Sequence, residues 1–206
     1  MRGRAGAAFL LAAASLFSAP YARAEEAFEA PPSFVLARMP GEGQTALSAF
    51  AGRPFESVWL DHGFLSFLDL GLAFDESSAG FFRLGGHLRL RALRLGDLEL
   101  SVRLAVARVL PQANSGYGAR AIARATDGEL SLLASYALLP RLALFAEGTV
   151  LGETDFGRPH TAAFLEVQGG AEWAVLGPFS VIGRYGVLKG ARASRAMGSA
   201  GLGIGF

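Results

Sequence analysis

Apolar and polar residues alternate with a period of two along most of the chain after residue 64. This period is typical of a β-strand with two different faces, because successive side chains point to opposite sides of a sheet. Each alternating segment is about 10 to 13 residues long, which suits a tilted strand that crosses a membrane. Eight such segments follow one another: 64–74, 81–93, 98–109, 128–139, 142–151, 162–174, 179–188 and 195–206. The pattern predicts an all-β chain.

The two faces of these predicted strands differ sharply in polarity. Segment 81–93 is the clearest case, because leucines alternate there with Arg83, His87, Arg89 and Arg91. Four basic groups on one side of a strand cannot join an apolar core, so they need a polar interior. We therefore expect a transmembrane, antiparallel, up-and-down β-barrel of eight strands, with ten as the alternative number, the apolar face toward lipid and the charged face toward the lumen.

The connections between the segments give an independent indication of the same fold. Transmembrane barrels join their strands alternately by short periplasmic turns and longer external loops. Short turns are expected at Gly96-Asp97, Pro140-Arg141 and Gly177-Pro178, and longer loops at 111–127, 152–161 and 189–194. The first external loop, 75–80, is the short one of its class. An even number of strands brings both ends of the barrel to the periplasmic side.

The N-terminal residues differ from the rest of the chain and divide into two parts. Arg2 and Arg4 precede an apolar stretch, and Ala22-Arg23-Ala24 forms a small-x-small cleavage site. Residues 1–24 are therefore predicted to be a signal peptide that is cleaved after Ala24. Residues 25–54 are rich in proline and glycine and show no sustained period, so we expect a flexible periplasmic leader. The barrel is then expected to occupy residues 55–206.

Composition narrows the possible functions. The 206 residues are 51% hydrophobic, which is high for an average soluble domain, yet no stretch after residue 24 is long and apolar enough for a membrane helix. The chain has no cysteine, which excludes disulfides, thiolate nucleophiles and zinc–thiolate sites. The net charge of +1 gives no basic surface for nucleic acid, so nucleic acid is not an expected partner.

The inward positions predict a network of charges in the lumen. Six basic residues balance six acidic ones, so we expect a lumen that is neutral overall. Isolated ions in a narrow cavity are costly, so these groups should pair across the barrel. The network either only fills the interior, or leaves a narrow conducting path for small solutes. Its predicted members are Asp69, Arg83, His87, Arg89, Arg91, Glu99, Arg103, Glu129, Glu147, Glu166, Glu172, Arg184 and Arg195.

The signal peptide, the amphipathic strands and the last segment together resemble the small outer-membrane β-barrels of Gram-negative bacteria. The last segment ends with Leu202, Ile204 and Phe206 on one face. In that group, a terminal aromatic residue on an alternating strand is the signal that the barrel-assembly machinery reads, and Phe206 matches it. The resemblance covers about residues 60–206 and is architectural, without pointing to a single family. It implies the outer membrane as the location, with its lipid and the assembly machinery as partners.

Some members of this group are lipid-modifying enzymes, but this sequence lacks their pattern. The lipid A deacylases need a His-x-Ser pair with an acidic partner that activates the serine. The three histidines of this chain stand in His62-Gly63-Phe64, His87-Leu88-Arg89 and His160-Thr161-Ala162. No metal-ligand spacing or phosphate loop is present either. We therefore expect no catalytic, cofactor or metal site and no enzymatic activity.

Three functions and one alternative fold remain open at this point. The first function is a structural or loop-mediated surface role, the second a narrow porin-like channel, and the third a lipid-modifying activity. No external ligand can be named. The alternative fold is a soluble lipocalin-like barrel with its apolar face inside. The alternation of short turns and long loops, the terminal phenylalanine and the charge-free apolar face favour the membrane barrel.

Overall fold

The computed structural model describes residues 36–53, 55–77, 81–111, 125–155, 160–190 and 194–206. These residues form ten β-strands, and among them no helix is long and apolar enough to cross a membrane. The strands are β1 (Thr45–Arg53), β2 (Phe55–Leu65), β3 (Leu68–Ser77), β4 (Phe81–Leu95), β5 (Leu98–Pro111), β6 (Ala125–Leu139), β7 (Leu142–Asp155), β8 (His160–Leu176), β9 (Phe179–Lys189) and β10 (Ser194–Gly205). The predicted signal peptide, residues 1–24, and residues 25–35 lie outside the described part of the chain.

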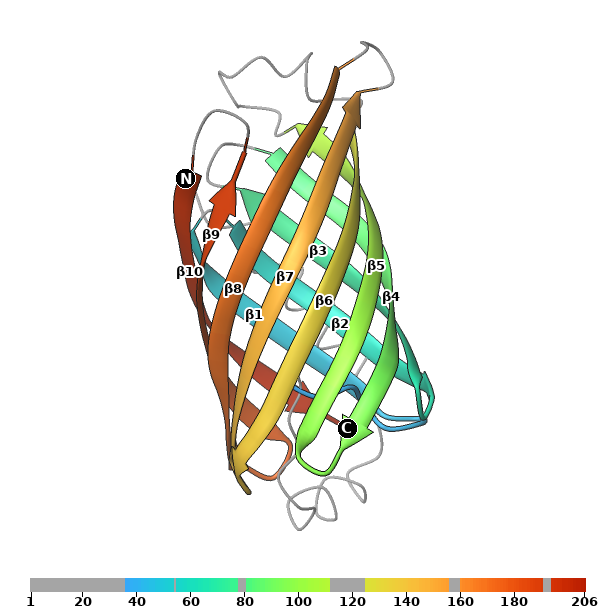
Figure 1. Cartoon of the computed structure of the whole chain (residues 1–206), viewed down its shortest axis with the longest axis vertical. Helices are drawn as coiled ribbons and strands as arrows, with labels where there is room; N and C mark the ends of the chain where they lie inside the picture. The colour runs from blue at the N-terminus through green and yellow to red at the C-terminus, as the bar shows by residue number, and fades with distance from the viewer. Residues whose placement is uncertain (1–35, 54, 78–80, 112–124, 156–159, 191–193) are drawn as a thin grey trace, which may run out of the picture.

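The strands close into an up-and-down barrel. Each strand pairs antiparallel with its neighbours in the chain, and β10 pairs with β1 to close the sheet (Figure 1). The closing register runs from Ala46 opposite Gly205 to Arg53 opposite Gly198. The predicted topology is thus confirmed, but the predicted number of strands is wrong: the barrel has ten strands and not eight.

The two additional strands, β1 and β2, precede the segments that the alternation identified. Strand β1 falls within residues 25–54, which were expected to be a flexible leader. Strand β2 was missed because several of its residues reverse the usual polarity of the two faces. Phe55 and Trp59 line the interior cavity, whereas Glu56 and His62 are exposed. A search for charges on one face and apolar residues on the other therefore finds no clean pattern here.

The apolar face of the barrel points outward and the charged face inward. On β6, Leu132 is 59% exposed, whereas its neighbour Ser131 is only 1% exposed. On β4, Leu84 and Leu90 are exposed, whereas Arg83 and Arg89 are buried. This is the arrangement predicted for a membrane barrel, and it is the reverse of a soluble barrel with an apolar core.

The turns at one end of the barrel are all short. They lie at residues 66–67, 96–97, 140–141 and 177–178. Gly96 and Gly177 have positive φ angles of 57° and 51°, which glycine adopts without strain in a tight turn. The C-terminus lies at the same end (Figure 1), where the amide of Gly205 donates to the carbonyl of Pro178 in the β8–β9 turn at 2.9 Å. In barrels of this type the end with short turns is the periplasmic one.

Candidate functional site in the barrel interior

The periplasmic end of the interior is filled by residues 36–40, which we call the plug. Leu36, Ala37 and Met39 are buried. The amide nitrogens of Leu36 and Ala37 donate to Glu172 Oε2 at 2.9 and 2.7 Å, and that of Met39 donates to Glu99 Oε1 at 3.0 Å. Two carboxylates of the wall thus satisfy peptide groups that would otherwise be buried without partners.

Arginines of β4 complete the surroundings of the plug. Arg89 donates to the carbonyl oxygens of Leu36 and Arg38, both at 3.2 Å, and its Nε donates to Asp69 Oδ2 at 2.8 Å. Arg91 pairs with Glu99 at 3.1 Å and donates to the carbonyl of Ser66 in the β2–β3 turn. The charges at this end therefore hold a chain segment inside the barrel as well as each other.

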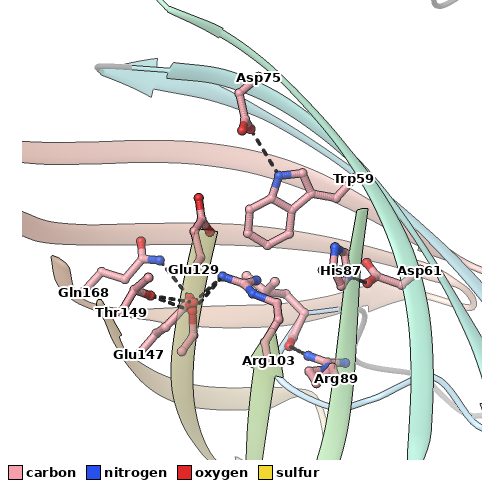
Figure 2. Close-up of polar contacts among 12 residues, drawn as sticks. Trp59, Asp61, Asp75, His87, Arg89, Arg103, Glu129, Glu147, Thr149 and Gln168 are labelled. Atoms are coloured by element: carbon pink, nitrogen blue, oxygen red, sulfur yellow. Dashed lines mark hydrogen bonds and ion pairs between the residues drawn. The ribbon is translucent and has the colours of Figure 1, made fainter. Parts of the chain in front are cut away.

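The middle of the interior contains a second polar group, centred on Glu147. Arg103 forms an ion pair with this carboxylate, and Gln168 donates to it at 2.8 Å (Figure 2). Thr149 also donates to Glu147, at 3.2 Å, and shares a hydrogen bond of 2.8 Å with Ser131. All five side chains are buried, and the carboxylate has a partner on both oxygens.

Two aromatic rings from the additional strands lie against Arg103 of this middle group and against Arg184 on β9. The Arg103 guanidinium carbon is 4.8 Å from the centroid of the Trp59 ring, and that of Arg184 is 4.2 Å from the Phe50 ring. Phe50 and Trp59 meet edge to face, with 5.6 Å between their centroids. Contacts of this length are favourable cation–π and aromatic interactions. Strands β1 and β2 therefore supply the apolar surface that supports the long arginine side chains.

The third group lies nearer the external end and is centred on Arg83. This guanidinium pairs with Asp75 at 3.3 Å, with Asp127 at 2.7 Å and with Glu129. Trp59 donates through Nε1 to Asp75 at 3.4 Å, as Figure 2 shows. One arginine is thus surrounded by three carboxylates from β3 and β6.

A cavity of about 90 Å³ lies between the middle and the external groups. This volume has room for several water molecules. The cavity is lined by charged, aromatic and small residues, among them Trp59, Arg83, His87, Arg103, Glu166 and Arg184. On the periplasmic side, the plug occupies the interior.

Most of the residues predicted for the lumen network lie on the inner side of the wall, but their partners differ from those expected. The ion pairs seen between described wall residues join strands that are adjacent or separated by one strand, rather than opposite sides of the lumen. Arg83 on β4 pairs with an acid on β6, and Arg103 on β5 pairs with an acid on β7, so each of these pairs skips one strand. Arg89 and Arg91 pair with acids on strands adjacent to β4. Glu166 and Arg184 line the cavity. Arg195 is the exception, because it is exposed near the start of β10.

Three inward acids were not predicted: Asp61, Asp75 and Asp127. Asp75 and Asp127 were assigned to loops, although each continues the inward parity of its strand beyond the predicted end. Asp61 lies on the unpredicted strand β2. With these residues included, acidic side chains outnumber basic ones on the inner face of the described wall, whereas equal numbers were predicted.

Comparisons with solved structures identify the class of fold. No family model matches the chain, and no curated protein matches it in sequence. Among solved structures, the KdgM porin in complex with disordered oligogalacturonate superposes with a TM-score of 0.51 over 79% of this chain and 98% of that one, at 6% identity. The fold is that of an outer-membrane β-barrel.

Two further structures of this class resemble the chain more loosely. Ail of Yersinia pestis matches over 80% of this chain and all (100%) of its own, with 14% identity and a TM-score of 0.42. A loop-deletion mutant of OmpT from Vibrio cholerae matches over 74% of this chain at 14% identity and a TM-score of 0.43. This chain covers 53% of the OmpT mutant, about half its length. The outer-membrane fold implies the outer membrane as the location.

Proposed function

We propose that the protein is a non-conducting outer-membrane barrel whose function is structural or is carried by its external surface. The observation on which this rests is the plug. Residues 36–40 occupy the periplasmic end of the interior and are bound there by Glu99, Glu172 and Arg89. A solute that crossed the barrel would have to displace this segment and break its charge-assisted hydrogen bonds, which are about twice as strong as neutral ones.

Conductance in planar lipid bilayers tests this proposal. The wild-type protein is expected to insert without stable current steps. The double variant Glu99→Gln, Glu172→Gln weakens both carboxylate anchors of the plug and is expected to produce steps or bursts of current. Glu56→Gln is the matched control, because Glu56 is exposed on β2, and it should behave as wild type. Reproducible steps of uniform size from the wild type would refute a closed barrel.

A narrow channel is the second candidate, and the internal cavity is the observation that favours it. The cavity is lined by ionisable groups, and the polar group around Glu147 adjoins it. If the plug moves aside in the membrane, small solutes would pass these charges. Current steps that disappear in Glu147→Arg would favour this function over the first one.

We also propose that the protein has no enzymatic activity on lipid. The support is the chemistry of its histidines: none precedes a serine by two positions, and His87 is engaged with Asp61 inside the barrel. The test is mass spectrometry of lipid A from cells that overexpress the protein. Unchanged acyl chains are expected, whereas a new deacylated species would contradict the proposal.

Assembly is proposed to follow the usual route of these barrels, with signal cleavage after Ala24 and recognition of Phe206 by the barrel-assembly machinery. Phe206 is half exposed, and it exchanges backbone hydrogen bonds of 2.7 and 2.8 Å with Thr45 at the seam between β1 and β10. Phe206 thus lies beside the pairing of the last strand, β10, with the first strand, β1. N-terminal sequencing of the membrane-inserted protein tests the cleavage site, and Phe206→Ala is expected to lower the amount that reaches the membrane.

A further inference from the structure

We propose that Asp61, Asp69 and His87 form a binding site for one divalent transition-metal ion, with Zn²⁺ as the best fit. The three side chains come from adjacent strands β2, β3 and β4, and each offers one ligand atom within 4.8 Å of the others. All three are buried. His87 Nε2 and Asp61 Oδ1 face each other at 2.5 Å (Figure 2).

The register of the sheet explains why these residues meet. Asp61 lies opposite Gly71, and Gly71 lies opposite His87, so the three form one row across β2, β3 and β4. A Cβ atom at position 71 would lie 2.3 Å from His87 Nε2 and 2.8 Å from Asp61 Oδ1. The missing side chain of Gly71 is therefore the space in which the two groups approach each other. Asp69 lies on β3, two positions before Gly71 and on the same face of the sheet.

Asp69 supplies the independent sign that a ligand belongs here. Its side chain has 0% exposure. Oδ2 accepts the hydrogen bond from Arg89, but Oδ1 is buried and has no hydrogen-bond partner among the described residues. A buried carboxylate oxygen without a partner is costly, since it gives up its hydration and gains nothing in return. A bound cation would satisfy it.

The charge of the interior favours the same ligand. The inner face of the described wall carries more acidic than basic side chains, and the hydrogen-bond partner of Asp61 in this cluster is the imidazole of His87. Arg89 compensates one of the two carboxylates of the cluster. A divalent cation would neutralise the remaining negative charge inside the barrel, where the attraction between charges is stronger than at a surface.

The donor set selects the class of metal. One imidazole nitrogen and two carboxylate oxygens suit Zn²⁺, which binds His and Asp at about 2.0 to 2.2 Å and takes water as a fourth ligand. Mg²⁺ and Ca²⁺ prefer oxygen ligands alone. Ligand atoms of a tetrahedral site are about 3.3 Å apart, so a small opening of the His87–Asp61 contact admits the ion. His87 also lines the internal cavity, which gives water access to the site.

The test uses the full chain, expressed without an affinity tag and purified from outer membranes in detergent. Co²⁺ serves as the spectroscopic probe, and a chromophoric chelator that competes for Zn²⁺ gives the affinity. We expect visible Co²⁺ bands that saturate at one equivalent and disappear when Zn²⁺ is added. The absence of saturable binding by the wild type would by itself overturn the proposal.

Single substitutions locate the bound ion. Asp61→Asn and His87→Gln are expected to lower Zn²⁺ affinity by at least about 100-fold. Loss of a residue that only hydrogen-bonds to a metal ligand already lowers affinity by up to about 100-fold, and each of these substitutions removes a ligand itself. Gly71→Ala should also weaken binding, because the new methyl group displaces His87. Two matched controls should retain the affinity: His62→Gln, an exposed histidine of the same strand as Asp61, and Asp75→Asn, a buried acid outside the cluster.

Each variant is first checked for heat-modifiable migration, which reports a folded barrel. If Asp61→Asn does not fold, His87→Gln decides, because it keeps the carboxylate charges in place. Binding that persists in His87→Gln, or that is lost in His62→Gln, would place the ion elsewhere and refute the site.

Discussion

Arg103 connects the two kinds of interaction that hold the interior of this barrel. Its guanidinium pairs with Glu147 and lies 4.8 Å from the centroid of the Trp59 ring. The Arg103 side chain is 9% exposed and that of its partner Glu147 3%. Removing one member of such a pair leaves the other charge buried without compensation, which costs more than the pair itself contributes to stability.

Arg103→Met is therefore expected to destabilise the barrel by about 3 to 5 kcal/mol. The measurement is reversible urea unfolding in lipid vesicles, followed by tryptophan fluorescence. Arg94→Met, at an exposed position of β4, is the control and should change stability by no more than about 0.5 kcal/mol. Adding Glu147→Gln to Arg103→Met should restore most of the loss. A double variant as unstable as the single one would show that lost packing against Trp59, and not the unpaired charge, is the cause.

The sequence predicted individual inward residues well wherever the alternation continued without interruption. Arg83, Arg89 and Arg103 all lie on the face that their parity indicates. Asp75 and Asp127 were missed because polar residues near strand ends look like loop residues when no partner strand is in view. Their partner, Arg83, lies on β4, next to β3 in the sheet and two strands from β6. Such contacts depend on register, which one sequence does not reveal.

The seam between β1 and β10 is the element that distinguishes ten strands from eight. Residues Ala46 to Arg53 pair with Gly205 to Gly198 along the seam. Gly201 lies opposite Phe50, and a Cβ atom there would lie 2.4 Å from the Phe50 ring and from the carbonyl oxygen of Ala49. The seam therefore needs a residue without a side chain at this point, because the Phe50 ring occupies the inner space.

Gly201→Val is expected to impair closure of the barrel, because the new side chain would clash with the backbone carbonyl of Ala49 and with the Phe50 ring, which is already packed against Trp59 and Arg184. The readout is the fraction of protein that shows heat-modifiable migration after folding into detergent. Gly183→Val is the matched control, since position 183 is exposed on β9 and no atom lies within 4 Å of its would-be Cβ. Equal folding of the two variants would show that β1 does not close the barrel in the way described.

The alternation of turns and loops could not have revealed the first two strands. If two strands are added in front of eight, every later connection remains a short turn or a long loop as before. The alternation of turns and loops is therefore the same for eight and for ten strands. The local pattern failed as well, since β1 has Ala46 and Phe50 on its buried face and β2 has Trp59 on the inner side. Apolar residues there support arginines from other strands, a role that cannot be read from β1 and β2 alone.

The closed wall, the plug and the ion pairs together make the interior a packed polar core inside an apolar shell. This arrangement inverts that of a soluble protein, and it is stable only when lipid covers the outside. Leu72, Leu132 and Val167 are each more than half exposed, and in water such a surface would drive aggregation. The molecule as a whole thus depends on the membrane in the same way that a soluble domain depends on water.

Single cysteines test this orientation directly, because the natural chain has none. Ser131 and Leu132 are neighbours on β6 with 1% and 59% exposure. A polarity-sensitive fluorophore attached to Leu132→Cys before folding is expected to report a lipid environment in vesicles and to be quenched by lipid-borne nitroxides. Ser131→Cys should resist a water-soluble maleimide in the folded barrel and react after unfolding. The opposite result would be a cysteine at 132 that reacts with the maleimide in the folded, vesicle-inserted protein, with a label that lipid-borne nitroxides do not quench. The apolar face would then not contact lipid, and the inward orientation of the charges would have no physical explanation.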